Sequence, residues 1–255
     1  PGLDRDYINY LPSYATTAWY HHKMAKPPAN VADAAAEARA FAEGPYASAL
    51  EKGQTISKQE EDSVAQQMSA LTGLSPQFIE NADLRVDLSE FRKELLRDQR
   101  ETIGRYDSRY TGIDPDAAGD APEFDASDVA ISGGFIGTMQ GYLANDLGYR
   151  TDMPYRLSAS DADGFKWDFK HKAPGIRYTL NDPNTAIDLA AAMRTNPYLK
   201  VLSLNGYYDM ATPFVGTEYD LDHMMLEPAQ QQNLEFRYYP SGHMVYLNPD
   251  ALHQM

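Results

Sequence analysis

The chain has 255 residues, of which 43% are hydrophobic and 23% charged, so it is long enough for one large domain or two modest ones. Its formal net charge of -15, with no dense Lys/Arg patch, argues against nucleic acid and against an anionic membrane surface as partners. Cysteine is absent, which excludes disulfides, Cys-ligated metals and a thiol nucleophile.

Two features bear on the compartment. No apolar run in the sequence approaches the roughly 18 residues that a membrane-spanning helix needs, so we expect no membrane partner. The chain opens with Pro1 rather than with an initiator Met, and we interpret it as a processed or excised piece. Because a targeting segment is removed by such processing, a secreted or periplasmic location stays open.

The first 20 residues are rich in Tyr and carry Pro12. Aromatic side chains need partners to bury against, and a free terminus is usually more polar. We therefore expect residues 1–20 to form a buried connection within a core.

Residues 31–102 have a helical pattern, with apolar residues recurring every three to four positions. Ser57 and Glu60 have the spacing of a capping box, which predicts the start of one of these helices. Short helices with polar outer faces and no intervening strands indicate a helical lid or bundle rather than βαβ units. The four helices are predicted to begin near Val31, Ser57, Ser75 and Ser89.

Gly, Pro and Asp recur in residues 104–128, which predicts a loop. Residues 129–147 read as a Gly-rich helix, and residues 150–175 turn polar and aromatic. A further helix, NTAIDLAAAMRTN, leads directly into an apolar run at residues 199–204. We expect this last part of the chain to be the end of a doubly wound α/β sheet.

Two predicted strands each deliver a chemically active residue. The run 199–204 ends at Asn205-Gly206 and is followed by Asp209, and the β-rich run 234–239 is followed by His243. Such a pair suits a triad, because the histidine takes a hydroxyl proton while the acid orients the imidazole and stabilises its charged form. Carboxyl ends of adjacent strands are where α/β folds place their sites. A turn Asp and a surface His are the alternative, and the strand-end placement favours the catalytic interpretation.

The nucleophile of such a triad is not evident. The motif G-x-S-x-G does not occur, and the closest match is Ala130-Ile131-Ser132-Gly133-Gly134. A nucleophile elbow needs a buried strand directly before it, and only three apolar residues precede Ser132. We expect a Gly-rich helix start capped by Asp128 instead.

Metal signals in the sequence are weak, and we predict neither a metal nor a cofactor. His21 and His22 are adjacent, so their side chains diverge on a helix or a strand. Asp220, Asp222 and His223 suit a solvated helix face. The run IDPDAAGD at residues 113–120 has the residue types of a calcium loop without its spacing or terminal Glu.

With the Asp and His segments in place, the chain resembles the C-terminal half of a serine carboxypeptidase-like α/β-hydrolase of a bacterial branch. The resemblance covers nearly all 255 residues, and the absence of Cys separates the chain from the disulfide-bearing eukaryotic members. The runs that carry it are YLPSYATTAWYHHK (10–23), LRVDLSEFRKELLRD (84–98), DSRYTGIDPDAAG (107–119), LKVLSLNGYYDMATPF (199–214) and YYPSGHMVY (238–246).

This resemblance implies a Ser-His-Asp hydrolase that removes C-terminal residues from peptides, with a helical cap inserted in the core. Asp209 and His243 match the family's acid and base, while its G-E-S-Y nucleophile motif and oxyanion donors lie upstream of residue 1. The implied partners are a peptide substrate and the missing N-terminal half. The implied segments are 1–20 from the core, 21–170 as the cap, and 171–255 returning to the core.

Two other functions stay open. One keeps the fold and changes the reaction to that of an esterase or acyltransferase, because acyl chemistry is shared between these enzymes. The other is a non-catalytic interaction module whose binding surface is the helical region 21–170.

Overall fold

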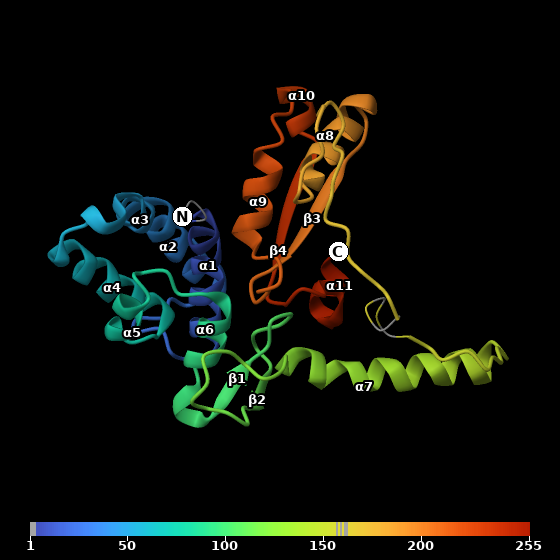
Figure 1. Cartoon of the computed structure of the whole chain (residues 1–255), viewed down its shortest axis with the longest axis horizontal. Helices are drawn as coiled ribbons and strands as arrows, with labels where there is room; N and C mark the ends of the chain where they lie inside the picture. Colours follow the sequence, from blue (N-terminus) through green and yellow to red (C-terminus); the bar gives the residue numbers. More distant parts are fainter. Residues whose placement is uncertain (1–3, 157, 159, 161–162) are drawn as a thin grey trace. The chain divides into compact units, whose positions relative to one another are not determined.

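The computed structural model describes residues 4–156, 158, 160 and 163–255, over which helices are combined with two small β-sheets (Figure 1). This agrees with the mixed α/β class that the sequence predicts. There are two compact units. The first contains the chain up to Ala130 together with Leu202–Tyr219 and Glu235–Met255, and the second contains Ile131–Val201 and Asp220–Leu234.

The first unit begins with a series of helices, and side chains cap the starts of several of them. Ser57 accepts a hydrogen bond from the backbone N–H of Glu60, and Asp87 with Glu90 forms a reciprocal capping box. Gly73, with a φ of 75°, ends the longer of these two helices in the left-handed conformation that glycine favours. The elements are α1 (Asp4–Tyr20), α2 (Val31–Phe41), η1 (Ala42–Tyr46), α3 (Ala47–Lys52), η2 (Gly53–Thr55), α4 (Lys58–Thr72), α5 (Pro76–Asn81), α6 (Leu88–Glu94) and η3 (Arg97–Gln99).

Residues 4–20 form a helix, in which most of the residues from Ile8 to Ala18 are buried as expected. Of its aromatic side chains, Tyr14 is buried, Tyr20 is exposed, and the others are half-buried. The Tyr14 ring stacks on the Phe91 ring with centroids 4.0 Å apart, and the Tyr14 hydroxyl donates to the Val86 carbonyl at 3.4 Å. The Tyr46 hydroxyl donates to the Leu84 carbonyl at 2.7 Å. Each ring thus fills the core while its polar atom keeps a partner, which burial of a tyrosine requires.

The loop predicted for residues 104–128 is found at 104–110 and 114–125, but a short β-hairpin interrupts it and ends the helix predicted to reach residue 102. The strands of the hairpin are β1 (Glu101–Ile103) and β2 (Thr111–Ile113), which pair antiparallel with Thr102 opposite Gly112. The β1–β2 loop comprises residues 104–110. Three-residue strands carry too little alternation for periodicity to reveal them.

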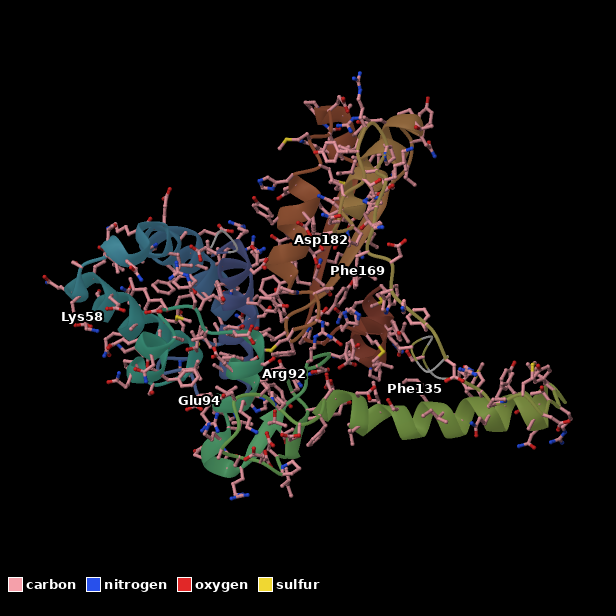
Figure 2. All side chains as sticks on the ribbon, in the orientation of Figure 1. Lys58, Arg92, Glu94, Phe135, Phe169 and Asp182 are labelled. Atoms are coloured by element: carbon pink, nitrogen blue, oxygen red, sulfur yellow. The ribbon has the colours of Figure 1, made fainter. Side chains whose placement is uncertain are left out.

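The loop after β2 is held by a basic side chain from α6. Lys93 is 1% exposed, and its ammonium lies 2.5 Å from a carboxylate oxygen of Asp114, which is itself buried. The same ammonium donates to the Asp116 carbonyl. In the segment whose composition resembles a calcium loop, the cation that binds these oxygens is therefore the ammonium of Lys93. Figure 2 labels two neighbours of Lys93, Arg92 and Glu94.

The second sheet consists of β3 (Val201–Gly206) and β4 (Leu234–Tyr239), close to the predicted bounds. Past the strand ends, Tyr207 N–H donates to the Tyr239 carbonyl and Tyr208 N–H to the Ser241 carbonyl, both at 3.0 Å. The residue numbers of donor and acceptor rise together from one bond to the next, so the two strands run parallel. Parallel neighbours need a crossover, and the helices α9 (Phe214–Asp222) and α10 (Pro228–Gln231) supply it.

The chain ends with η6 (Val245–Leu247) and α11 (Pro249–Gln254). Pro249 is the first residue of α11, and the Asn248 side chain caps the helix by accepting from the N–H groups of Asp250 and Ala251. Ala251 then packs with Tyr239 and Val245 in a small cluster of its own.

The second unit has its own small core. It contains most of α7 (Ala126–Gly141), with η4 (Tyr142–Asp146) and α8 (Thr185–Thr195). Phe135 and Phe169, labelled in Figure 2, are exposed. None of the helices in the described residues is both long and apolar enough to cross a membrane. The buried side chains of the core are Ala190, Met193, Met224 and Leu226.

Candidate active site

Asp209 and His243 lie just past the ends of β3 and β4, so both belong to the first unit. The two turns that carry them touch at a pair of glycines. A β-carbon on Gly206 would lie 2.3 Å from the Gly242 carbonyl oxygen, and one on Gly242 would lie 2.4 Å from the Tyr106 carbonyl oxygen. Backbone atoms on both sides leave no room for a side chain, so glycine at these positions lets the turns approach.

The two side chains that the sequence singles out meet directly. His243 Nδ1 lies 3.0 Å from Asp209 Oδ2. Because a carboxylate only accepts hydrogen bonds, Nδ1 carries the proton of the neutral imidazole and donates it. This assigns the tautomer in which Nε2, the other ring nitrogen, has a free lone pair. A base that takes a hydroxyl proton needs that lone pair.

The Asp209 carboxylate is 7% exposed, and four donors converge on it. Oδ1 accepts from the backbone N–H groups of Ala211 at 2.8 Å and Thr212 at 3.0 Å. Oδ2 accepts from the Thr212 hydroxyl at 2.7 Å as well as from His243. The Thr212 oxygen lies 3.1 Å from His243 Nδ1, so it is a second acceptor for the imidazole proton. The turn after β3 thus fixes the orientation of both side chains of the pair.

The β1–β2 loop contacts the turns that carry the acid and the histidine. His243 N–H donates to the Tyr106 carbonyl at 2.6 Å, and Met210 N–H donates to the Arg105 carbonyl at 3.0 Å. Ser108 N–H donates to the Tyr208 carbonyl at 3.0 Å. Backbone hydrogen bonds therefore tie this loop to both sides of the pair.

Arg109 adds a side-chain link from the same loop. Its Nε and Nη2 bind the two carboxylate oxygens of Asp107 at 2.9 and 2.6 Å, and its Nη1 donates to the Pro240 carbonyl at 2.9 Å. The guanidinium carbon also lies 5.2 Å from the centre of the Tyr208 ring. Hydrogen bonding and attraction to the Asp107 carboxylate outweigh burial and raise the pKa of Arg109.

The free edge of the imidazole is open. The His243 side chain is 38% exposed, and within the described part of the chain its Nε2 has no hydrogen-bond partner. The Tyr106 ring lies beside it, with centroids 5.4 Å apart and planes tilted by 47°. The arrangement is able to orient an imidazole and present its basic nitrogen to an incoming group.

No serine of the described residues lies within hydrogen-bond distance of His243. Ser132 lies in the interior of α7, not at a strand-to-helix turn. The expected cap by Asp128 is wrong in one detail: the Asp125 carboxylate accepts from Ser127 N–H at 2.9 Å and begins the helix. A helix interior does not expose a serine in the way that a nucleophile elbow does.

Sequence reasoning missed Thr212, Tyr106, Asp107 and Arg109. Asp107 and Arg109 stand two positions apart in a run that reads as loop, which is a common surface pairing. Only the fold brings this loop to residues 206–210 and 240–243. Thr212 could have been predicted from the sequence, because a threonine three residues after an Asp in a turn often binds the Asp carboxylate.

His21 and His22, the adjacent pair at the end of α1, do not form a metal site. His21 Nε2 lies 2.7 Å from the Ser108 carbonyl, so this nitrogen is the donor. Burial lowers the pKa of His21 below the usual histidine value. Over the described residues, no group of three or more His, Asp and Glu side chains is arranged to hold a metal ion.

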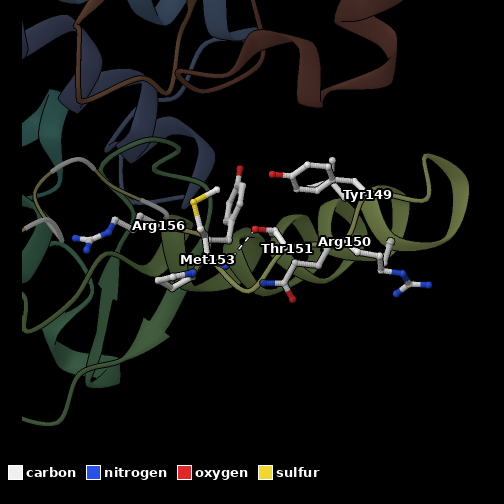
Figure 3. A pocket seen from close by; sticks show the side chains of 10 residues that line it. Tyr149, Arg150, Thr151, Met153 and Arg156 are labelled. Carbon is white, nitrogen blue, oxygen red and sulfur yellow. Dashed lines mark hydrogen bonds between the residues drawn. The ribbon is translucent and has the colours of Figure 1, made fainter.

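The second unit also contains a pocket (Figure 3). None of the described residues that line it is a His, Asp or Glu. Tyr149, Met153 and Tyr155 give it an apolar character. The lining residues are Gln140, Leu143, Ala144, Tyr149, Arg150, Thr151, Met153, Pro154, Tyr155 and Arg156.

Comparison of the chain with protein-family models, with curated proteins and with solved structures gave no match.

Proposed function

We propose that the chain is the C-terminal part of a serine carboxypeptidase-like α/β-hydrolase and that Asp209 and His243 are its acid and base. The observation that carries the proposal is the 3.0 Å contact from His243 Nδ1 to a buried carboxylate, with Nε2 left open. The parallel β3–β4 pair, which presents both residues at its carboxyl end, supports the α/β-hydrolase fold. The resemblance in sequence supports the peptidase reaction, with segments 1–20 and 171–255 as core and 21–170 as cap.

In the proposed reaction, a serine from outside these 255 residues attacks the carbonyl carbon of the C-terminal peptide bond. His243 Nε2 takes the proton of the serine hydroxyl and later gives it to the leaving amine. Asp209 holds the imidazole in the required tautomer and stabilises its charged form. Water then hydrolyses the acyl-enzyme, and His243 serves again as the base. The chain alone is expected to be inactive, because the nucleophile and the oxyanion donors provide most of the rate.

The test uses the protein expressed from its complete reading frame and a fluorophosphonate probe, which reacts with activated serines. We expect one labelled serine and C-terminal trimming of peptides. Asp209→Asn should lower kcat about 10⁴-fold, and His243→Ala on the order of 10⁶-fold. His253→Ala is the matched control, because His253 is an exposed histidine of α11.

Three results would contradict the proposal. The first is the absence of a labelled serine in the complete protein. The second is a His243→Ala variant that keeps its function, as a non-catalytic interaction module built on residues 21–170 would. The third is hydrolysis of esters without hydrolysis of peptides, which would move the assignment to an esterase or acyltransferase on the same fold.

A further inference from the structure

The β1–β2 loop, residues 104–110, is the segment from which this inference starts. It lies far from residues 209 and 243 in sequence, yet its backbone accepts from His243 N–H and from Met210 N–H and donates to the Tyr208 carbonyl. Its own shape is fixed internally, since Gly104 N–H donates to the Tyr110 carbonyl and Tyr110 N–H donates to the Asp107 carbonyl. A closed loop of this kind is a rigid support for what it touches.

Arg109 is the side chain through which this loop reaches the histidine turn. The planar guanidinium binds both oxygens of Asp107, which leaves Nη1 aimed at the Pro240 carbonyl. Pro240 lies three residues before His243, and Asn248 also donates to its carbonyl, at 3.0 Å. The two donors fill both lone pairs of this oxygen and fix the start of the turn.

We infer that Arg109 is a positioning residue that holds His243 in the orientation in which Nδ1 donates to Asp209. The inference rests on the proposed function, because it assigns a purpose in catalysis to that orientation. Asp107 orients the planar guanidinium of Arg109 by binding it at two points. A lysine ammonium does not make this two-point contact. Tyr106 fixes the other end of the same contact, through its carbonyl and through its ring against the imidazole.

The chain contains a matched control. Arg85 also binds both oxygens of an aspartate, Asp4, at 2.8 and 3.0 Å, and also donates to a backbone carbonyl, that of Leu50, at 3.1 Å. The exposed fractions of the two side chains are alike, at 27% for Arg85 and 25% for Arg109. The Arg85 contacts lie outside the turns that carry Asp209 and His243. Arg85 makes one further bond, to the Asp83 carbonyl at 3.0 Å, so Arg85→Gln removes at least as many hydrogen bonds as Arg109→Gln and differs in what those bonds hold.

The test measures the tautomer of His243 by ¹⁵N NMR of the full-length protein labelled at histidine, at about pH 8.5, where an ordinary imidazole is neutral. His243→Gln assigns the signal. We expect the wild type and Arg85→Gln to show Nδ1 protonated and Nε2 bare. Arg109→Gln should shift both nitrogen signals towards the averaged values of an imidazole that exchanges between its two tautomers.

Unchanged His243 signals in Arg109→Gln, or an equal shift in Arg85→Gln, would overturn the inference. If Arg109→Gln does not fold, Arg109→Lys is measured instead. It keeps the cation but loses the two-point contact with Asp107, so a smaller shift in the same direction is expected and unchanged signals again overturn the inference. The readout needs no turnover. Absence of an acyl-enzyme would therefore refute the proposed function while leaving the role of Arg109 to be decided by the NMR signals.

Discussion

At the scale of single residues, the candidate site depends on how completely one carboxylate is satisfied. Asp209 takes two backbone N–H groups, one hydroxyl and one imidazole, so its orientation is set by partners on either side. His243 is only half satisfied, because Nδ1 donates to Asp209 whereas Nε2 has no hydrogen-bond partner among the described residues. This asymmetry distinguishes the pair from an ordinary surface ion pair, in which both partners remain mobile.

Thr212→Val provides a test at this scale. The substitution keeps the β-branched shape but removes the hydroxyl that donates to Asp209 Oδ2 at 2.7 Å. Loss of one such hydrogen bond corresponds to about 0.5–1.5 kcal/mol, so we expect kcat/KM of the complete enzyme to fall roughly threefold to tenfold. Thr212→Ser, which keeps the hydroxyl, should stay close to the wild type. Wild-type activity in Thr212→Val would show that this hydrogen bond does not support the pair.

At the scale of elements, the protein relies on short segments fixed by buried polar side chains. The loop after β2 has few apolar residues to bury, and basic side chains hold it instead. Lys93 of α6 binds Asp114 and the Asp116 carbonyl, and Arg97 donates to the carbonyls of Ala117 and Gly119. Burying an unpaired ammonium or an unpaired carboxylate destabilises the folded state, so each of these two groups needs the other as its partner. This pair therefore acts as a lock, in the sense that it fixes the loop after β2 against α6.

Lys93→Met tests the lock. It leaves the Asp114 carboxylate buried beside an apolar side chain, and we expect a loss of about 3–5 kcal/mol in the free energy of unfolding, measured by urea denaturation. The double variant Lys93→Met/Asp114→Asn should recover a large part of that loss, because no unpaired charge remains. Lys52→Met removes an exposed pair with Glu60 and should cost less than about 1 kcal/mol. A double variant no more stable than Lys93→Met would contradict this explanation.

At the scale of the whole molecule, the response to pH combines a large negative charge with a few buried basic groups. The chain carries a formal net charge of -15, so protonation of surface carboxylates relieves repulsion as the pH falls. His21 acts in the opposite sense, because burial lowers its pKa in the folded state. Above the unfolded pKa of about 6.5 both states are neutral at this residue. Below it the unfolded state takes up the proton first, so stability falls as the pH falls towards the folded pKa.

His21→Gln should remove that loss. Burial is the main cause of the lowered pKa, and it outweighs the hydrogen bond to the Ser108 carbonyl and the charge of Glu101, which favour the charged imidazole. We expect the urea midpoint of the wild type to fall more between about pH 7.5 and pH 5 than that of His21→Gln, which keeps a donor for the Ser108 carbonyl. His22→Asn is the control and should follow the wild type. Equal pH dependence in wild type and His21→Gln would show that His21 does not titrate on unfolding.

Local signals determined the elements that the sequence predicted well. Ser57 with Glu60 indicated the start of α4, because capping acts over three residues and is written in the adjacent sequence. The runs 199–204 and 234–239 indicated the strands and placed Asp209 and His243 after them. The burial expected for residues 1–20 is found over most of Ile8–Ala18, whereas Pro12 and the many aromatic residues concealed the helix that these residues form.

The tertiary structure decided what surrounds the pair. The contacts from Arg109 to Pro240, from Tyr106 to His243 and from Ser108 to Tyr208 join residues roughly a hundred or more positions apart. Neither periodicity nor capping patterns encode such contacts, because these patterns act between residues close in sequence. The contacts form only when the folded chain compensates the entropy cost of closing long loops. Local sequence patterns were enough to predict that an acid and a histidine follow two strands. The fold determined that their side chains meet, that Nε2 stays open, and that the β1–β2 loop holds the histidine turn in place.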